Sequence, residues 1–301
     1  MFIYILSVFI GMLNASIVFV NGDLTAAYGM YSAAMLIHIV GCAFALLCLV
    51  VRRQKLGLRG THLPLWMYLG GAVGFFTTVF NNFSYGKISV TGIVALSLLG
   101  QAVTSLVIDS AGLFGMPRTR FRASSLAGLI LAGAGIAVML ADAQLSAALS
   151  VAAAFTTGVT IVVSRVINAS LSERIGGMPG SFINHLVGLP VTVAAVLLFG
   201  RSEPLFTGVS FPPPLWAFTG GLLGVTTVYL CNRVVPRVSS FRFTLLGFVG
   251  QIAAGLAIDV LSGQPSSRAM VIGTAIIALG LVANMLLDRR RKGTGEGEHA
   301  A

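Results

Sequence analysis

The sequence consists of long, continuously apolar stretches separated by short polar connections. Ten stretches have about the 20 residues that an α-helix needs to cross the hydrocarbon core of a bilayer. Their ranges are 2–21, 31–51, 64–83, 88–110, 123–141, 147–168, 180–200, 214–232, 240–260 and 269–287. Because apolar residues run continuously and do not alternate with polar ones, the pattern predicts helices and not the strands of a barrel. We expect an all-α integral membrane protein with ten transmembrane helices, the first retained as a helix and not removed as a signal peptide.

The second half of the chain repeats the polar landmarks of the first. The repeat has an offset of 147 residues at first, of 150 over residues 60–110, and of 145 near the end. The aligned pairs include His38 with His185, Trp66 with Trp216, Gln101 with Gln251, Asp109 with Asp259, and Gly135 with Gly280. The pattern predicts two five-helix repeats, residues 1–145 and 146–288, followed by a disordered basic tail over residues 289–301.

Composition agrees with a membrane protein and excludes a soluble domain. Hydrophobic residues make up 56% of the chain and charged residues 9%, with a mean hydropathy of +0.93. Soluble domains carry about 25% charged residues. The three cysteines have no ligand spacing, so neither a disulfide nor a metal site is predicted.

The basic residues predict the orientation of the chain. With ten crossings, 16 of the 19 Lys and Arg residues fall on one side of the membrane, and only Lys87, Arg201 and Arg268 on the other. This asymmetry predicts that both termini are cytoplasmic in a bacterial plasma (inner) membrane. The net charge of +10 then reflects topology and contact with membrane lipids, and no nucleic-acid partner is expected. Arg165, near the end of its stretch, is expected to extend toward the cytoplasmic surface.

An odd number of helices in each half determines how the halves are related. The first half begins inside and ends outside, so equivalent helices of the second half run in the opposite direction. The halves are therefore expected to form an inverted repeat with a working site near the membrane midplane between them.

Several short motifs resemble a known family. They are Asn21 near the end of the first stretch, Trp66 followed by the pair Gly70-Gly71, Gly100-Gln101 followed by Asp109, Gly-Leu-Phe-Gly at 112–115, and Pro117. Together they resemble the YdcZ-type family of the drug/metabolite transporter superfamily, known mainly as five-helix proteins, and here two such units are fused. The resemblance implies a membrane transporter of that fold. The first-helix Glu of the related small multidrug exporters has no counterpart in the stretches 2–21 and 147–168, so their proton-coupled mechanism does not carry over.

Two polar stripes with four-residue spacing are candidates for the transport pathway. Each contains a Gln and ends in an Asp: Ser97, Gln101, Ser105 and Asp109 in one, and Gly247, Gln251, Gly255 and Asp259 in the other. We expect Gln101 and Gln251 to bind substrate and Asp109 and Asp259 to couple transport to protons or cations. The alternative is that the stripes are packing seams between helices.

His38, His185 and Asn14 complete the set of candidate pathway residues. The two histidines are repeat equivalents that could relay protons or shape a site, or simply bond to neighbouring helices. Asn14 has no polar equivalent in the second repeat, where Ile161 occupies the aligned position. It could recognise substrate or bond to nearby backbone.

The predicted function is a secondary transporter that moves a small organic solute or lipid-like compound by alternating access. The sequence contains no phosphate-binding loop and none of the hydrolase or zinc-protease motifs that would indicate an enzyme. A non-transporting membrane scaffold is the alternative, and an intramembrane enzyme is the third. Expected partners are a small-molecule substrate and membrane lipids, with no cofactor, and a homodimer is left open.

Overall fold

The long elements of the described part of the chain are all helices. The computed structural model describes residues 2–57, 63–116, 118, 124–140, 145–238, 240–263 and 268–295. Its helices are α1 (Phe2–Tyr28), α2 (Met30–Val51), α3 (Gly70–Ser84), α4 (Val90–Ala111), α5 (Ser124–Leu140), α6 (Leu145–Ile175), α7 (Gly177–Phe199), α8 (Pro204–Thr207), α9 (Gly220–Val234), α10 (Ser240–Ser262) and α11 (Arg268–Gly295). Short 3₁₀ segments, Leu65–Tyr68 and Leu215–Thr219, lead into α3 and α9.

Seven of the described helical segments are long and apolar enough to cross a membrane. They include α1, α2, α4, α7 and α10, most of α6, and the segment Leu215–Arg237 that contains α9. The stretches predicted at 64–83, 123–141 and 269–287 coincide with α3, α5 and α11; within α5 and α11 the described residues include the shorter apolar segments Leu129–Val138 and Val271–Gly280. Helix α11 continues to Gly295, within the range 289–301 predicted as a tail.

The turns between the helices follow from local sequence. Gly29 and Gly176 adopt positive φ angles of 95° and 100°, which glycine adopts readily, and they separate α1 from α2 and α6 from α7. Helix α4 begins at Ser89, whose side chain accepts a hydrogen bond from the Gly92 N–H at 3.1 Å, and it ends at the left-handed Gly112.

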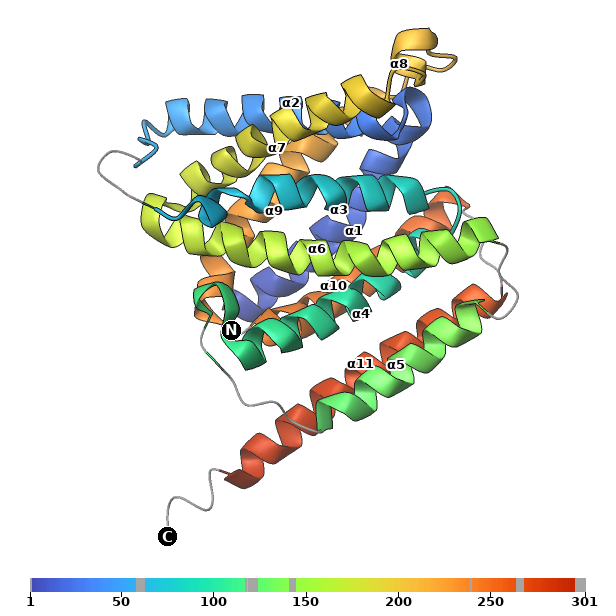
Figure 1. Cartoon of the computed structure of the whole chain (residues 1–301). Helices are drawn as coiled ribbons and strands as arrows, with labels where there is room; N and C mark the ends of the chain where they lie inside the picture. Colours follow the sequence, from blue (N-terminus) through green and yellow to red (C-terminus); the bar gives the residue numbers. More distant parts are fainter. Residues whose placement is uncertain are drawn as a thin grey trace.

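The helices pack in reciprocal pairs. Helix α1 packs against α10, as α6 packs against α4. Helix α3 contacts α6 and α7, and α9 contacts α1 and α2 in the same way. The pairs α2 with α7, α4 with α10, and α5 with α11 join corresponding helices of the two halves, and α5 and α11 lie side by side along one edge (Figure 1).

Glycines allow two of these crossings to be very close. A Cβ atom at Gly11 of α1 would collide with the backbone carbonyl of Gly247 in α10, and one at Gly158 of α6 with that of Ser97 in α4. The helices therefore meet backbone to backbone, as is common for membrane helices with small residues at their interfaces.

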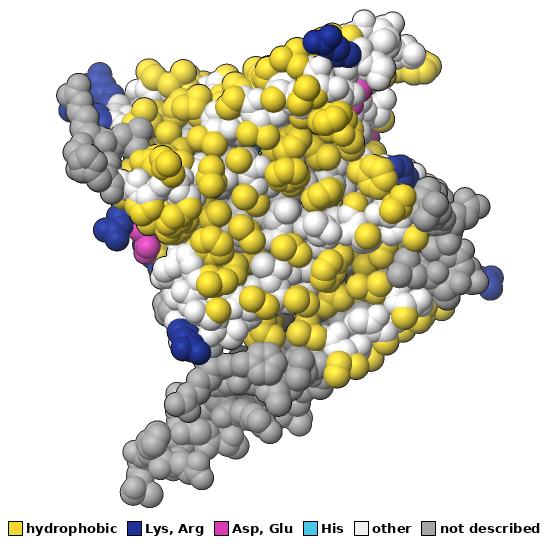
Figure 2. Space-filling model, viewed as in Figure 1, with side chains coloured by type: hydrophobic (Ala, Val, Ile, Leu, Met, Phe, Trp, Pro, Cys, Tyr) yellow, Lys and Arg dark blue, Asp and Glu magenta, His cyan; other side chains and the backbone are white. Residues whose placement is uncertain are grey.

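The surface is apolar around the middle of the helices. Figure 2 shows hydrophobic side chains across the visible face, with Lys and Arg toward its edges. Large side chains are exposed on several helices: Leu46, Leu47 and Val50 of α2, Leu197 and Leu198 of α7, and Val260 and Leu261 of α10. Contiguous exposed apolar surface of this kind fits lipid and not water.

Candidate functional site

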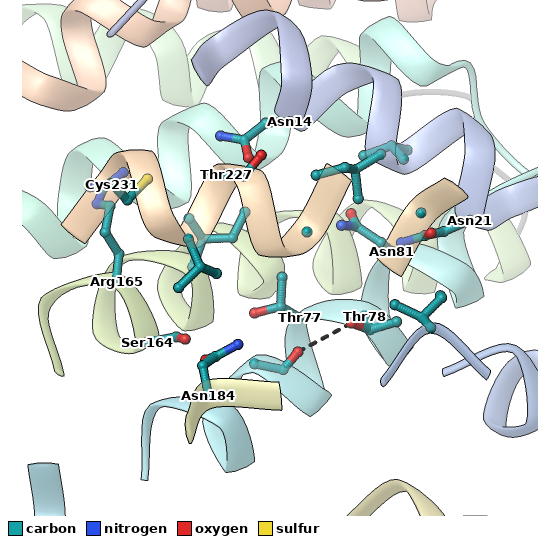
Figure 3. A pocket seen from close by; sticks show the side chains of 18 of the residues that line it. Asn14, Asn21, Thr77, Thr78, Asn81, Ser164, Arg165, Asn184, Thr227 and Cys231 are labelled. Atoms are coloured by element: carbon teal, nitrogen blue, oxygen red, sulfur yellow. Dashed lines mark hydrogen bonds between the residues drawn. The ribbon is translucent and has the colours of Figure 1, made fainter. Parts of the chain in front are cut away.

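A cavity lies between the two halves of the chain, inside the helix bundle. It has a volume of about 160 Å³ and is lined by residues of α1, α2, α3, α4, α6, α7, α9 and α10 (Figure 3). Its polar lining residues are Asn14, Asn21, His38, Thr77, Thr78, Asn81, Ser97, Ser164, Arg165, Asn168, Asn184, His185, Thr227, Asn232 and Gln251. One water needs only about 10–15 Å³ by a comparable measure, so the cavity has room for several waters or a small organic molecule.

Most of the residues predicted to form the pathway lie at this cavity. Asn14, His38, His185 and Gln251 line it. Gln101 is fully buried beside it and is not a lining residue, but its Oε1 accepts a hydrogen bond from Arg165 Nη1 at 3.3 Å.

The two histidines meet at the contact between α2 and α7. Their ring centroids are 5.8 Å apart, and each Nδ1 lies within 3.0 Å of a backbone carbonyl one turn earlier in its own helix, that of Ala34 or Ser181. Each ring packs against a glycine of the other helix. A Cβ atom at Gly41 of α2 would overlap the ring of His185, and one at Gly188 of α7 would overlap the ring of His38. The carbonyl acceptors favour the tautomer with a proton on Nδ1 and a free Nε2.

A chain of amide and hydroxyl groups joins α6, α7 and α3 along one side of the cavity. Asn168 Nδ2 lies 2.7 Å from Asn184 Oδ1 and 3.2 Å from Ser164 Oγ. The Ser164 hydroxyl in turn donates to the carbonyl of Gly70 at 2.7 Å. These bonds fix the side chains that face the cavity from α6 and α7.

Arg165 is the functional candidate that sequence reasoning misplaced. Its side chain was expected to extend to the membrane surface, but it is 6% exposed and lines the cavity. The reason is that α6 continues to Ile175, ten residues beyond, so that Arg165 lies about 15 Å from the end of the helix. One sequence signal could have indicated that Arg165 has a special role. The equivalent position in the first half holds Val18, so the arginine is present in only one of the two repeats.

The guanidinium of Arg165 contacts neutral groups of α4 and α10. Besides Gln101, its Nη2 donates to the hydroxyls of Ser105 at 3.5 Å, Ser240 at 3.2 Å and Thr244 at 3.0 Å. It also lies over the ring of Phe243, 4.5 Å from the centroid. The Nε atom is buried and has no hydrogen-bond partner.

Asp109 and Asp259 do not line the cavity but join α4 and α10 at opposite ends. The Asp109 carboxylate accepts backbone N–H bonds from Ser240 and Phe241, at 3.2 and 3.0 Å. The Asp259 carboxylate accepts those of Val90 and Thr91, both at 2.9 Å. Each acid thus binds the free N–H groups at the first turn of the other helix, which makes α4 and α10 antiparallel.

Several polar atoms at the cavity lack a partner within the described chain. They are Asn21 Oδ1, Asn81 Oδ1, Arg165 Nε, Thr227 Oγ1 and Asn232 Oδ1. Buried polar groups in folded proteins are usually satisfied, so a group of unpaired atoms around one cavity is typical of a site that holds water or a polar ligand.

Comparison with known proteins assigns the chain to a family. The family model described as "Putative inner membrane exporter, YdcZ" matches residues 2–138 and, a second time, residues 149–283. The chain belongs to the YdcZ family. No curated protein matches the sequence. One solved crystal structure of a protein has the same fold, with a TM-score of 0.63 and 19% identity, over 95% of this chain and 98% of that one.

Membership of the YdcZ family confirms the resemblance drawn from the sequence motifs. It identifies the chain as a multi-pass inner-membrane protein of an exporter family, which argues against an enzymatic role. The cavity and its polar lining are therefore the candidate site for a transported compound.

Proposed function

We propose that this YdcZ-family protein is a secondary transporter that exports a small organic solute or lipid-like compound by alternating access. The observation that carries the proposal is the cavity between the halves, with polar groups inside a bundle that exposes large apolar side chains on several helices. Polar groups at membrane depth are unfavourable unless they serve a site or bond to each other, and several of these are unpaired.

The proposal includes ten membrane-spanning helices arranged as two inverted repeats, residues 1–145 and 146–288. The reciprocal packing of the helices supports it, as does the antiparallel pairing of the equivalent helices α4 and α10. Under this arrangement both termini are cytoplasmic, and the halves rock about a site at the midplane. Reporter fusions at the C-terminus test the orientation, and a periplasmic C-terminus would contradict it.

We also propose that Asp109 and Asp259 couple transport to protons or cations. In the described conformation both carboxylates are bound to backbone N–H groups, so coupling requires α4 and α10 to separate and expose one carboxylate to water at a time. In liposomes the double variant Asp109→Asn, Asp259→Asn should lose the response to a pH gradient. Unchanged pH-driven transport by that variant would exclude both acids.

The competing function is a membrane scaffold whose polar residues only pack. The two functions differ in whether water reaches the cavity from both sides. In a background with Cys42, Cys48 and Cys231 replaced by Ser, we expect Asn14→Cys to react with a small water-soluble thiol reagent in both right-side-out and inside-out vesicles.

The matched control for this labelling is Leu46→Cys. Leu46 is 50% exposed on the outer, apolar face of α2, where lipid excludes an aqueous reagent. Absence of labelling at position 14 would favour the scaffold, and labelling from one side only would leave a static cavity without alternating access.

A further inference from the structure

Arg165 is a buried cation in a cavity that has no acidic lining residue. Among the described residues that line the cavity there is no Asp and no Glu, and Arg165 carries the permanent charge. Moving a guanidinium out of water is costly unless a partner compensates its charge. The lining residues of this chain leave that role open.

The hydrogen bonds that Arg165 makes within the protein are all to neutral groups. Its four donor–acceptor distances are 3.0, 3.2, 3.3 and 3.5 Å, all to amide or hydroxyl oxygens. Charge-assisted bonds from a guanidinium to an anion are about 2.7–2.9 Å and roughly twice as strong as neutral ones. Together with the unpaired Nε–H, these distances show that the hydrogen-bonding capacity of the guanidinium is not used fully.

Asp109 is not among the hydrogen-bond partners of Arg165. Both carboxylate oxygens of Asp109 are bound to the first turn of α10. Ser240 stands between them, since its backbone N–H donates to Asp109 and its hydroxyl accepts from Arg165. Asp109 therefore does not occupy the position beside the unpaired Nε–H.

Part of the cavity lining from α1 and α4 is apolar. Val18, the repeat equivalent of Arg165, lies with Ile93 and Val94 in one hydrophobic cluster, and all three line the cavity. Ser164, Arg165 and Asn184 lie together at one end of the view in Figure 3. The cavity thus offers a cationic, hydrogen-bonding cluster from α6 and α7 and an apolar patch of Val18, Ile93 and Val94 beside the polar groups of α1 and α4.

We propose that the cavity binds a small organic anion with a single acid group, which the Arg165 guanidinium holds, and an apolar body that packs toward Val18. The acid group is a carboxylate or another singly charged oxyanion, because one guanidinium supplies one compensating charge. That this anion is the transported substrate rests on the proposed transport function. Binding of the anion to the cavity can be measured without transport.

The test uses acids and their uncharged and cationic counterparts on the same carbon skeleton. Purified protein in a nonionic detergent is titrated at pH 7 with hexanoate, hexanamide and hexylamine, and with benzoate, benzamide and benzylamine. Binding is read by calorimetry and by the shift in melting temperature. We expect at least one acid to bind at least about tenfold more tightly than its amide and amine, which corresponds to ~1.4 kcal/mol.

Variants connect this preference to Arg165. Arg165→Gln should weaken binding of the acid at least about tenfold and abolish the preference over the amide, and Arg165→Lys should retain part of it. The matched control is Arg237→Gln, an exposed arginine outside the cavity, which should bind the acid as the wild type does. If Arg165→Gln does not fold, the acid-to-amide comparison in the wild type still tests the proposal.

Three results would overturn the inference: no acid that binds more tightly than its amide and amine, a folded Arg165→Gln protein with unchanged acid affinity, or no binding of either acid. Failure of transport is distinguishable from these results. Acid binding without flux in liposomes would contradict the transporter, whereas Arg165-independent flux of a neutral compound would contradict the anion site.

Discussion

The carboxylates of Asp109 and Asp259 should contribute strongly to stability, because each binds two backbone N–H groups of the neighbouring helix. Asp109 is 2% exposed, so Asp109→Ala leaves both N–H groups of α10 buried without an acceptor. A hydrogen bond to a charged group contributes about 1.5–3 kcal/mol. We therefore expect the free energy of unfolding to fall by about 3–5 kcal/mol in Asp109→Ala.

The asparagine variants refine this expectation. Asp109→Asn keeps one acceptor oxygen and loses the charge, so the loss should be about 1.5–3 kcal/mol. Asp259 makes shorter bonds but is partly exposed. Because water can partly replace the lost acceptor there, Asp259→Asn should cost less than Asp109→Asn.

Titration of the purified protein with a denaturing detergent measures these differences, with helicity and intrinsic fluorescence as probes. Glu173→Gln serves as the matched control, because Glu173 is exposed near the end of α6 and its loss should change stability by less than ~0.5 kcal/mol. An Asp109→Ala protein as stable as the wild type would refute the reasoning, since it would mean that the two N–H groups do not depend on the carboxylate.

Four further substitutions test other contacts. Glu203→Gln should expose the connection after α7 to proteolysis in right-side-out vesicles, because its carboxylate binds two N–H groups at the start of α2 at 2.7 and 2.8 Å; unchanged cleavage would contradict this. Tyr85→Phe should cost about 0.5–1.5 kcal/mol of unfolding free energy by removing the bond to Asp23 at 2.8 Å. Burial raises the pKa of Tyr85 above its usual value, so its contribution should persist up to about pH 10 and decline only above it, and an earlier decline in a pH series of unfolding curves would argue against that contact. Gly158→Ala should prevent assembly of α6 on α4, seen as loss of the monodisperse protein in size-exclusion chromatography, and normal yield would rule out the close crossing. His185→Ala should reduce flux in liposomes and leave the melting temperature within a few degrees, whereas wild-type flux would assign the ring to packing alone.

The sequence predicted the helical segments well because their signals are local. Continuous apolar runs and the glycines that break them identify the segments later found as α1, α2, α4, α6, α7 and α10. The repeat also pointed to His38 and His185 as a pair, and their rings do lie together. In a symmetric arrangement, equivalent residues near the symmetry axis lie close together. A sequence repeat can therefore predict which distant residues are in contact.

The contacts between distant helices were beyond the reach of sequence patterns. Arg165 reads as a residue near a helix end until the length of α6 is known. The partners of Asp109 are backbone N–H groups of α10. Every residue except proline has such a group, so the residue types in the sequence do not indicate which N–H groups an Asp will bind. The unpaired amides at the cavity, such as Asn81, likewise depend on which helices meet there.

The single arginine at the cavity has a consequence for how such a protein can evolve. A symmetric pair of identical five-helix chains would present either two arginines or two valines at the positions held here by Arg165 and Val18. Two guanidinium groups in one small cavity repel each other. Joining the two units in one gene allows each copy to mutate independently, so that one charge, and one orientation of a charged ligand, can be selected.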